Sequence, residues 1–335
     1  MKSLVSRLFI WGFDGTSVST RLKKVLRDFP PAGLILFRRN IESPSQLRRL
    51  TRNLRSFCDA PLLIGIDQEG GRVSRLPPPF IQYPPAATWG QIFQRMSHRR
   101  GSQFLRRIGR FMGLELKGIG INIDFAPVLD VLSNPRNPVI GDRAFSDDPE
   151  IVIQTALPFA QGLRESGIIP CGKHFPGHGD TWSDSHQSLP RVNRSSERLK
   201  RCELIPFRAA VRSGIPALMT AHVVYPCWDP KRPASLSPKI LGSILRDRLR
   251  FRGVVISDDL DMKAISKKWD LIEATLLALE AGVDLPLICK GFEERGSIVE
   301  AVTREVLQSP ALQEAVSGAS SRLRALIRKI PKLGG

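Results

Sequence analysis

The sequence predicts an α/β protein with a single (β/α)8 barrel of the TIM type. Eight short apolar runs alternate with amphipathic helical runs along the 335 residues, and no low-complexity linker divides them. Polar residues follow many of the apolar runs, at the strand ends where barrel enzymes carry their catalytic loops. We therefore expect one barrel domain over residues 1–335. A doubly wound sheet is the alternative, but no G-x-G-x-x-G motif follows the first strand.

The elements are expected in regular alternation. The strands are residues 8–12, 33–37, 62–66, 121–125, 167–171, 217–220, 254–256 and 283–289. The helices are residues 17–29, 44–58, 102–117, 149–166, 195–213, 238–250 and 272–281, and the remainder of the chain is helical. Ser43 and Pro44 are typical of a helix start. Pro286 is disfavoured in a central strand, so the eighth strand has the weakest pattern and leaves room for an irregular barrel.

The chain is strongly basic, with a formal net charge of +18 and an isoelectric point near 10.4. Such a balance is typical of proteins that bind nucleic acid or an anionic surface. Here the charges fall on the solvated faces of the expected helices, and no nucleic-acid-binding motif is present. We expect a globally basic enzyme without a nucleic-acid partner.

The cysteine pattern indicates the compartment. The five cysteines are scattered and never occur in C-x-x-C spacing, which predicts reduced thiols in a cytoplasmic protein. Residues 1–15 lack the cleavage site of a signal peptide, and no run of eighteen apolar residues could span a membrane. We expect a cytoplasmic monomer.

Residues 173–186 concentrate titratable groups. Three histidines, two aspartates and one lysine fall within these fourteen residues. Pro176, Gly177 and Gly179 interrupt any helical or strand period, so a loop is expected from Lys173 onward. A metal site made of the three histidines is the alternative, but their spacing does not match a helical His-x-x-x-His pair. We expect a catalytic loop without a metal or cofactor.

Two groups of acidic residues are candidates for catalysis. In an extended segment Asp184 and His186 lie on the same side, so the carboxylate can orient the imidazole for proton transfer. Asp258 directly follows an apolar strand and is a candidate nucleophile, whereas its neighbour Asp259 is expected to turn outward. A turn with helix-capping aspartates is the alternative for this second group.

Substrate contacts are expected from cations near these acids. Arg75, Arg143 and Lys173 can bind a polar substrate or neutralise the carboxylates. Asp67 can accept hydrogen bonds from two adjacent sugar hydroxyls.

Four ordered motifs together resemble glycoside hydrolase family 3, specifically its β-N-acetylglucosaminidases of bacterial cell-wall recycling. They are Gly65-Ile66-Asp67-Gln68-Glu69-Gly70-Gly71-Arg72-Val73, Lys173-His174-Phe175-Pro176-Gly177-His178-Gly179, Asp184-Ser185-His186 and Ser257-Asp258-Asp259-Leu260. The likeness extends over nearly the whole chain. Trp182, Ser183 and Asp261 depart from the family's usual residues without removing an expected catalytic group.

The resemblance implies an exo-acting, retaining hydrolysis of terminal N-acetylglucosamine from muropeptide fragments. Asp258 would form a glycosyl-enzyme, and His186 paired with Asp184 would act as acid and base. Asp67, Arg75, Arg143, Lys173 and His174 would hold the sugar, while His178 would be structural. Two alternatives remain open, namely a phosphorylase that uses phosphate instead of water, and a non-catalytic basic barrel that binds an anionic polymer.

Overall fold

A computed structural model describes residues 1–58, 60–183, 189–290 and 295–329. Its centre is a closed barrel of eight parallel strands in the order β1-β12-β11-β8-β7-β6-β3-β2. The strands are β1 (Ile10–Gly12), β2 (Gly33–Leu36), β3 (Leu63–Ile66), β6 (Ile123–Asp124), β7 (Ile169–Phe175), β8 (Ala217–Thr220), β11 (Val254–Asp259) and β12 (Leu285–Ile288). The predicted (β/α)8 barrel is therefore confirmed.

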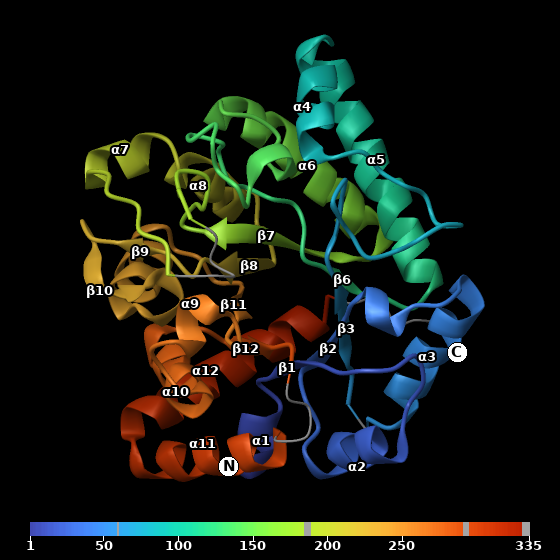
Figure 1. Ribbon diagram of the computed structural model, residues 1–335, viewed down its shortest axis with the longest axis vertical. Coiled ribbons are helices and arrows are strands. Elements are labelled where there is room, and N and C mark those ends of the chain that lie inside the picture. The colour runs from blue at the N-terminus through green and yellow to red at the C-terminus, as the bar shows by residue number, and fades with distance from the viewer. Residues whose placement is uncertain (59, 184–188, 291–294, 330–335) are drawn as a thin grey trace.

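Helices surround the strands (Figure 1). The longer ones are α2 (Thr20–Asp28), α3 (Pro44–Ser56), α4 (Ala86–Gln94), α5 (His98–Gly118), α6 (Pro149–Ser166), α8 (Leu204–Arg212), α10 (Leu271–Ala281), α11 (Arg295–Gln308) and α12 (Pro310–Ile327). Shorter segments are α1 (Lys2–Ser6), α7 (Ser196–Arg201), α9 (Lys263–Ser266) and the 3-10 turns η1 (Arg38–Asn40), η2 (Gly141–Arg143) and η3 (Ala234–Leu236). A π-helical segment, η4 (Lys239–Arg248), precedes β11.

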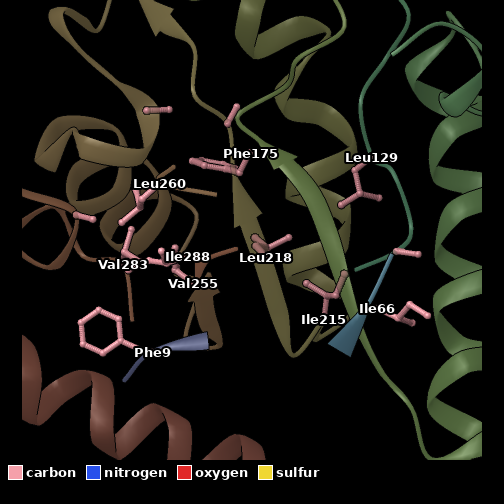
Figure 2. Packing of buried hydrophobic residues seen from close by; sticks show 14 of the residues in the cluster. Phe9, Ile66, Leu129, Phe175, Ile215, Leu218, Val255, Leu260, Val283 and Ile288 are labelled. Carbon is pink, nitrogen blue, oxygen red and sulfur yellow. The ribbon is translucent and has the colours of Figure 1, made fainter. Parts of the chain in front are cut away.

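Two hydrophobic layers follow from the alternation of side chains along the strands. Ile35, Leu63 and Ile256 belong to the cluster that fills the barrel. Within each strand, the residues that alternate with these inward-facing ones belong to a second cluster. That cluster packs the outer side of the strands against the helices. Figure 2 shows this outer layer around Leu218 and Val255. Residues two apart in a strand point to the same side. A polar residue two positions after an inward-facing apolar residue therefore points into the open end of the barrel.

Several sequence predictions need correction. The prediction of a loop from Lys173 onward is wrong for its first residues, because strand β7 continues through Lys173 and His174 to Phe175. The expected helix over residues 195–213 is two helices. Pro206 has no amide hydrogen to donate to the carbonyl of Cys202, four residues earlier, and the break falls there. Helices α1 and α4 were not expected.

A small hairpin stands over the carboxyl end of β3. Its strands, β4 (Gln68–Gly70) and β5 (Val73–Ser74), are joined at Gly70 and Gly71, whose φ angles of 96° and 56° favour glycine. The side-chain oxygen of Gln68 accepts the backbone N–H of Arg75 at 3.0 Å. The hairpin thereby returns Arg75 to the strand end that carries Asp67. A second hairpin pairs β9 (Val224–Tyr225) with β10 (Asp229–Pro233).

Candidate active site

A cavity of about 600 Å³ opens at the carboxyl ends of the barrel strands. Its lining draws on residues that follow β3, β7, β11 and β12 and on the loops around them. Among its charged and polar lining residues are Arg39, Asp67, Arg72, Arg75, Arg143, Lys173, His174, His178, Asp258, Asp259, Asp261, Lys263 and Lys290. Residues far apart in sequence thus converge at the end of the barrel where catalysis was expected.

Lys173 is the buried centre of the cavity floor. Its ammonium lies 2.7 Å from Oδ1 of Asp67 and 2.6 Å from Oε1 of Glu69, and its side chain is 2% exposed. Burial alone would raise the pKa of Asp67, but Lys173 and Arg75 outweigh that effect and hold it below its ordinary value. Asp67 is therefore an ionised acceptor at the bottom of the cavity.

Two arginines flank this lysine. Arg143 donates from Nε and from one terminal nitrogen to the two oxygens of Glu69, each at 2.8 Å. Arg75 lies 3.3 Å from Oδ2 of Asp67. Burial works against ionisation of Glu69, yet Arg143 and Lys173 lower its pKa well below the ordinary value. The result is one connected chain of charges in the order Arg75, Asp67, Lys173, Glu69 and Arg143.

His174 is oriented by a buried carboxylate. Its Nδ1 lies 2.7 Å from Oδ2 of Asp130, while Oδ1 of Asp130 accepts the backbone N–H of His178 at 2.7 Å. Nε2 of His174 lies 3.4 Å from a terminal nitrogen of Arg143, which can only donate. With its proton on Nδ1, His174 donates to Asp130 and leaves Nε2 free to accept from Arg143. Asp130 and Arg143 together therefore select this tautomer of His174.

Asp258 lies near the end of β11, two residues beyond the inward-facing Ile256. Its Oδ1 accepts the backbone N–H of Asp259 at 2.8 Å. Burial raises the pKa of Asp258, but His222, His174 and this hydrogen bond outweigh it and lower the pKa below its ordinary value. The side chain is thus an ionised carboxylate at the cavity wall, as a nucleophile requires.

The expectation that Asp259 turns outward is wrong. Its side chain is half-buried, lines the cavity and accepts the backbone N–H of Cys289 at 3.0 Å and of Asp261 at 3.1 Å. Burial, with a smaller contribution from the charge of Asp261, raises the pKa of Asp259 to about 6. Asp259 therefore ties β11 to the end of β12, next to the ionised Asp258.

The structure places the other predicted residues unevenly. Asp67, Arg75, Arg143, Lys173 and His174 meet at one cavity together with Asp258. Asp184 and His186 lie outside the described residues. The described chain before them is anchored through Thr181, whose backbone carbonyl accepts from Asn134 at 2.8 Å and whose hydroxyl accepts from Asn137 at 3.0 Å.

Sequence reasoning missed the two carboxylates that orient the substrate-binding candidates. Glu69 lies in the hairpin after β3, and Asp130 lies in an irregular segment after β6. Neither follows a strand directly, so the strand-end rule did not single them out. Two weaker signals were available: Asp130 stands inside the apolar run from Val128 to Leu132, and Glu69 belongs to the first of the four motifs. His178 is 1% exposed and lines the cavity, and burial lowers its pKa to about 4, which keeps it neutral near pH 7.

Within the described part of the chain, no group of three or more histidine, cysteine, aspartate or glutamate side chains is arranged to hold a metal ion. His222, which the sequence places at a strand end, does not line the cavity. Its Nδ1 lies 2.7 Å from the hydroxyl of Ser235, and its Nε2 lies 2.9 Å from the carbonyl oxygen of Asp259. His222 therefore supports the backbone beside Asp258.

Comparison with known proteins identifies relatives along most of the chain. The family described as "Glycosyl hydrolase family 3 N terminal domain" matches residues 6–323. A β-hexosaminidase of Thioalkalivibrio sulfidiphilus is 39% identical over 292 residues, which are 87% of this chain and 83% of that protein. A β-hexosaminidase of Nitrosomonas eutropha is 42% identical over 257 residues, which are 77% of this chain and 73% of that protein.

Solved structures show the same fold. A family 3 β-N-acetylglucosaminidase from a Paenibacillus species superposes with a TM-score of 0.94 at 37% identity, over 100% of this chain but only 63% of that one. NagZ from Neisseria gonorrhoeae superposes with a TM-score of 0.79 at 33% identity, over 94% of this chain and 98% of that one. The chain belongs to glycoside hydrolase family 3 and is a glycoside hydrolase.

Proposed function

We propose that this protein is a retaining exo-β-N-acetylhexosaminidase that removes terminal N-acetylglucosamine from muropeptide fragments of peptidoglycan. The observation that carries the proposal is the position of Asp258, an ionised carboxylate at the wall of the same cavity that holds Asp67, Lys173 and His174. The β-hexosaminidase relatives and the structures of N-acetylglucosamine-cleaving enzymes support the sugar specificity.

The cavity floor favours recognition of a terminal sugar. Lys173, Asp67 and Glu69 close the cavity toward the barrel interior with a buried set of ion pairs. We propose that a terminal sugar occupies this inner end of the cavity and that the rest of the substrate lies toward the mouth, which corresponds to an exo action. Asp67 would accept from two adjacent hydroxyls, and Lys173, Arg75, Arg143 and His174 would surround the other polar groups of the sugar.

The reaction would proceed in two displacements. A carboxylate oxygen of Asp258 attacks the anomeric carbon, the bond to the leaving oxygen breaks, and His186 donates a proton to that oxygen. Water then attacks the glycosyl-enzyme, His186 takes its proton, and Asp258 is released as a carboxylate. Asp184 would orient His186 and stabilise its protonated form. Two inversions at one carbon retain its configuration.

A phosphorylase remains the second candidate, because cations gather at the cavity. Lys263 and Lys290 line it, and neither makes an ion pair to a carboxylate within the described residues. Phosphate would then replace water in the second step and yield a sugar 1-phosphate. Product analysis with and without phosphate separates the two reactions, since hydrolysis yields free N-acetylglucosamine in both conditions.

A role in the recycling of cell-wall fragments in the cytoplasm accords with the chemistry of the chain. All five cysteines are free, and three of them are buried. No helix among the described residues is long and apolar enough to cross a membrane. We further propose that a monomeric barrel over residues 1–335 suffices for activity, which light scattering combined with turnover measurements would test.

The experiment that tests the proposed function is a time course on a chromogenic β-N-acetylglucosaminide and on the matching β-glucoside, followed by mass analysis of a digested muropeptide. We expect fast release from the N-acetyl sugar, slow release from the glucoside, and loss of one terminal N-acetylglucosamine from the muropeptide. Equal rates on the two chromogenic substrates would contradict the sugar specificity, and an intact muropeptide would contradict the natural substrate.

A further inference from the structure

Four arginines surround a second hollow of about 600 Å³, away from the catalytic cavity. Arg208 and Arg212 belong to α8, Arg248 ends η4, and Arg250 lies in the following turn. Because α8 leads into β8 and η4 leads into β11, which are neighbouring parallel strands, the hollow lies toward the amino ends of the strands. That is the face opposite the catalytic cavity, and the two share no lining residue.

The charge of this hollow is not neutralised by the protein. Among the described residues, none of the four arginines makes an ion pair with a carboxylate, and Arg208 contacts only the carbonyl oxygen of Lys200, at 3.5 Å. Nearby Arg246 behaves differently, since it lies 2.7 Å from Asp284. Val211 and Leu249 complete the lining without adding negative charge.

A purely structural explanation covers only part of the cluster. Arg212 and Arg248 stand in the last turns of their helices, where a cation favours the helix dipole. Arg250 has no such role. Its φ of 59° makes it the one non-glycine residue with a positive φ in the described part of the chain. Glycine is the usual residue at such a position after a helix, so the arginine stands there at a cost in backbone strain that its helix position does not explain.

We propose that this hollow binds a compact small molecule that carries two or more phosphate groups. Guanidinium groups match phosphate oxygens in pairs, and several phosphates are needed to offset four converging cations. The hollow is shallow and open to solvent, and its volume of about 600 Å³ leaves room for a small molecule. The arginines converge on one hollow rather than forming a stripe along the surface, which favours a small ligand over a polymer.

The experiment is calorimetric titration of the full chain with inorganic triphosphate at constant salt, and separately with a nucleoside triphosphate. We expect one saturable site per chain. The double variant Arg212→Gln/Arg248→Gln should weaken binding by at least about tenfold, because it removes two charge-assisted contacts. The control Arg99→Gln/Arg100→Gln, at exposed positions of α5, removes the same charge and should leave the affinity within about twofold.

If the nucleoside triphosphate binds more tightly than inorganic triphosphate, the ligand is a nucleotide. If the two bind equally, the site recognises only the phosphate groups. Either result supports the site. An equal loss in the control variant would overturn the proposal, since it would attribute binding to the general positive field. So would the absence of a saturable site, or binding confined to long nucleic acid.

Arg250→Gly provides a second test, since it removes the guanidinium from a backbone conformation that suits glycine. We expect unchanged or higher thermal stability together with weaker triphosphate binding. Unchanged binding would contradict the proposal. Turnover of the chromogenic glycoside should be the same in all these variants, because none of the changed residues lines the catalytic cavity. Failure of the proposed phosphate site can therefore be distinguished from failure of the proposed glycosidase activity.

Discussion

The ammonium of Lys173 lies 2.6 Å from Oε1 of Glu69, with both side chains almost completely buried at the end of the barrel. The same ammonium contacts Asp67 at 2.7 Å, so one cation serves two carboxylates. The groups that we propose to bind the sugar are thereby held in place by buried ion pairs.

Removal of the central cation should be costly. Lys173→Met leaves buried Asp67 and Glu69 with one cation fewer, and we expect a loss of about 3–5 kcal/mol in the free energy of unfolding. Turnover should fall with it. Arg106→Gln is the control, because its ion pair with Glu165 lies at the solvent-exposed surface and should contribute little to stability. Denaturant unfolding measures both, and equal losses would contradict the role of the buried network.

Asp130 should act through His174. Asp130→Asn keeps the shape of the side chain but replaces an acceptor by an amide that can donate, which disturbs the tautomer of His174 that Arg143 also requires. We expect kcat/KM to fall by about 10- to 100-fold, the effect of one charge-assisted hydrogen bond. Asp130→Glu should recover part of the loss if the carboxylate is what matters. A normal kcat/KM in Asp130→Asn would rule out this positioning role.

Asp259 should give the protein an unusual dependence of stability on pH. Its pKa is about 6 in the folded protein and about 3.9 when unfolded, so the folded state binds more protons between these values. This group therefore lowers stability as pH rises from about 4 to about 6. Asp259→Asn should remove that contribution. The free energy of unfolding of the wild type should therefore decrease relative to that of the variant as pH rises from about 4 to about 6. Parallel curves of unfolding free energy against pH would contradict the prediction.

Trp182 should affect the part of the substrate beyond the cleaved bond. Its side chain is 63% exposed, two residues before Asp184, and the guanidinium of Arg136 lies 5.6 Å from its ring. We expect Trp182→Ala to raise KM for a disaccharide about two- to tenfold through lost stacking, with little effect on a small aryl glycoside. Phe111→Ala, at an equally exposed position on α5, should change neither value. Equal effects on both substrates would exclude a stacking role.

The sequence predicts the barrel well because strands and helices differ in local period. All eight barrel strands overlap their expected ranges, including the one with Pro286. The strand-end rule also predicts that Asp67, Lys173 and Asp258 lie together, because the carboxyl ends of the strands meet at one end of a barrel. These are local properties, and they can be read from a single chain.

Contacts between distant segments could not be predicted in this way. Strand β7 extends through Lys173, whose buried ammonium pairs with Asp67 and Glu69, more than a hundred residues earlier in the sequence. Asp130 orients His174 across 44 positions of sequence. The prediction that Asp259 turns outward failed because its side chain accepts a hydrogen bond from the backbone N–H of Cys289, and neighbouring residues in sequence do not reveal that contact. These three errors share one cause, a polar partner supplied by a segment that is distant in sequence.

The central claim is that Asp258 forms a covalent bond to the sugar. Incubation with a slow, fluorinated N-acetylglucosaminyl fluoride, followed by proteolysis and mass spectrometry, tests it directly. We predict that the peptide containing Asp258 gains the mass of one sugar residue, and that Asp258→Ala gains none and has almost no turnover. Labelling of a different residue, or near-normal turnover by Asp258→Ala, would contradict the account.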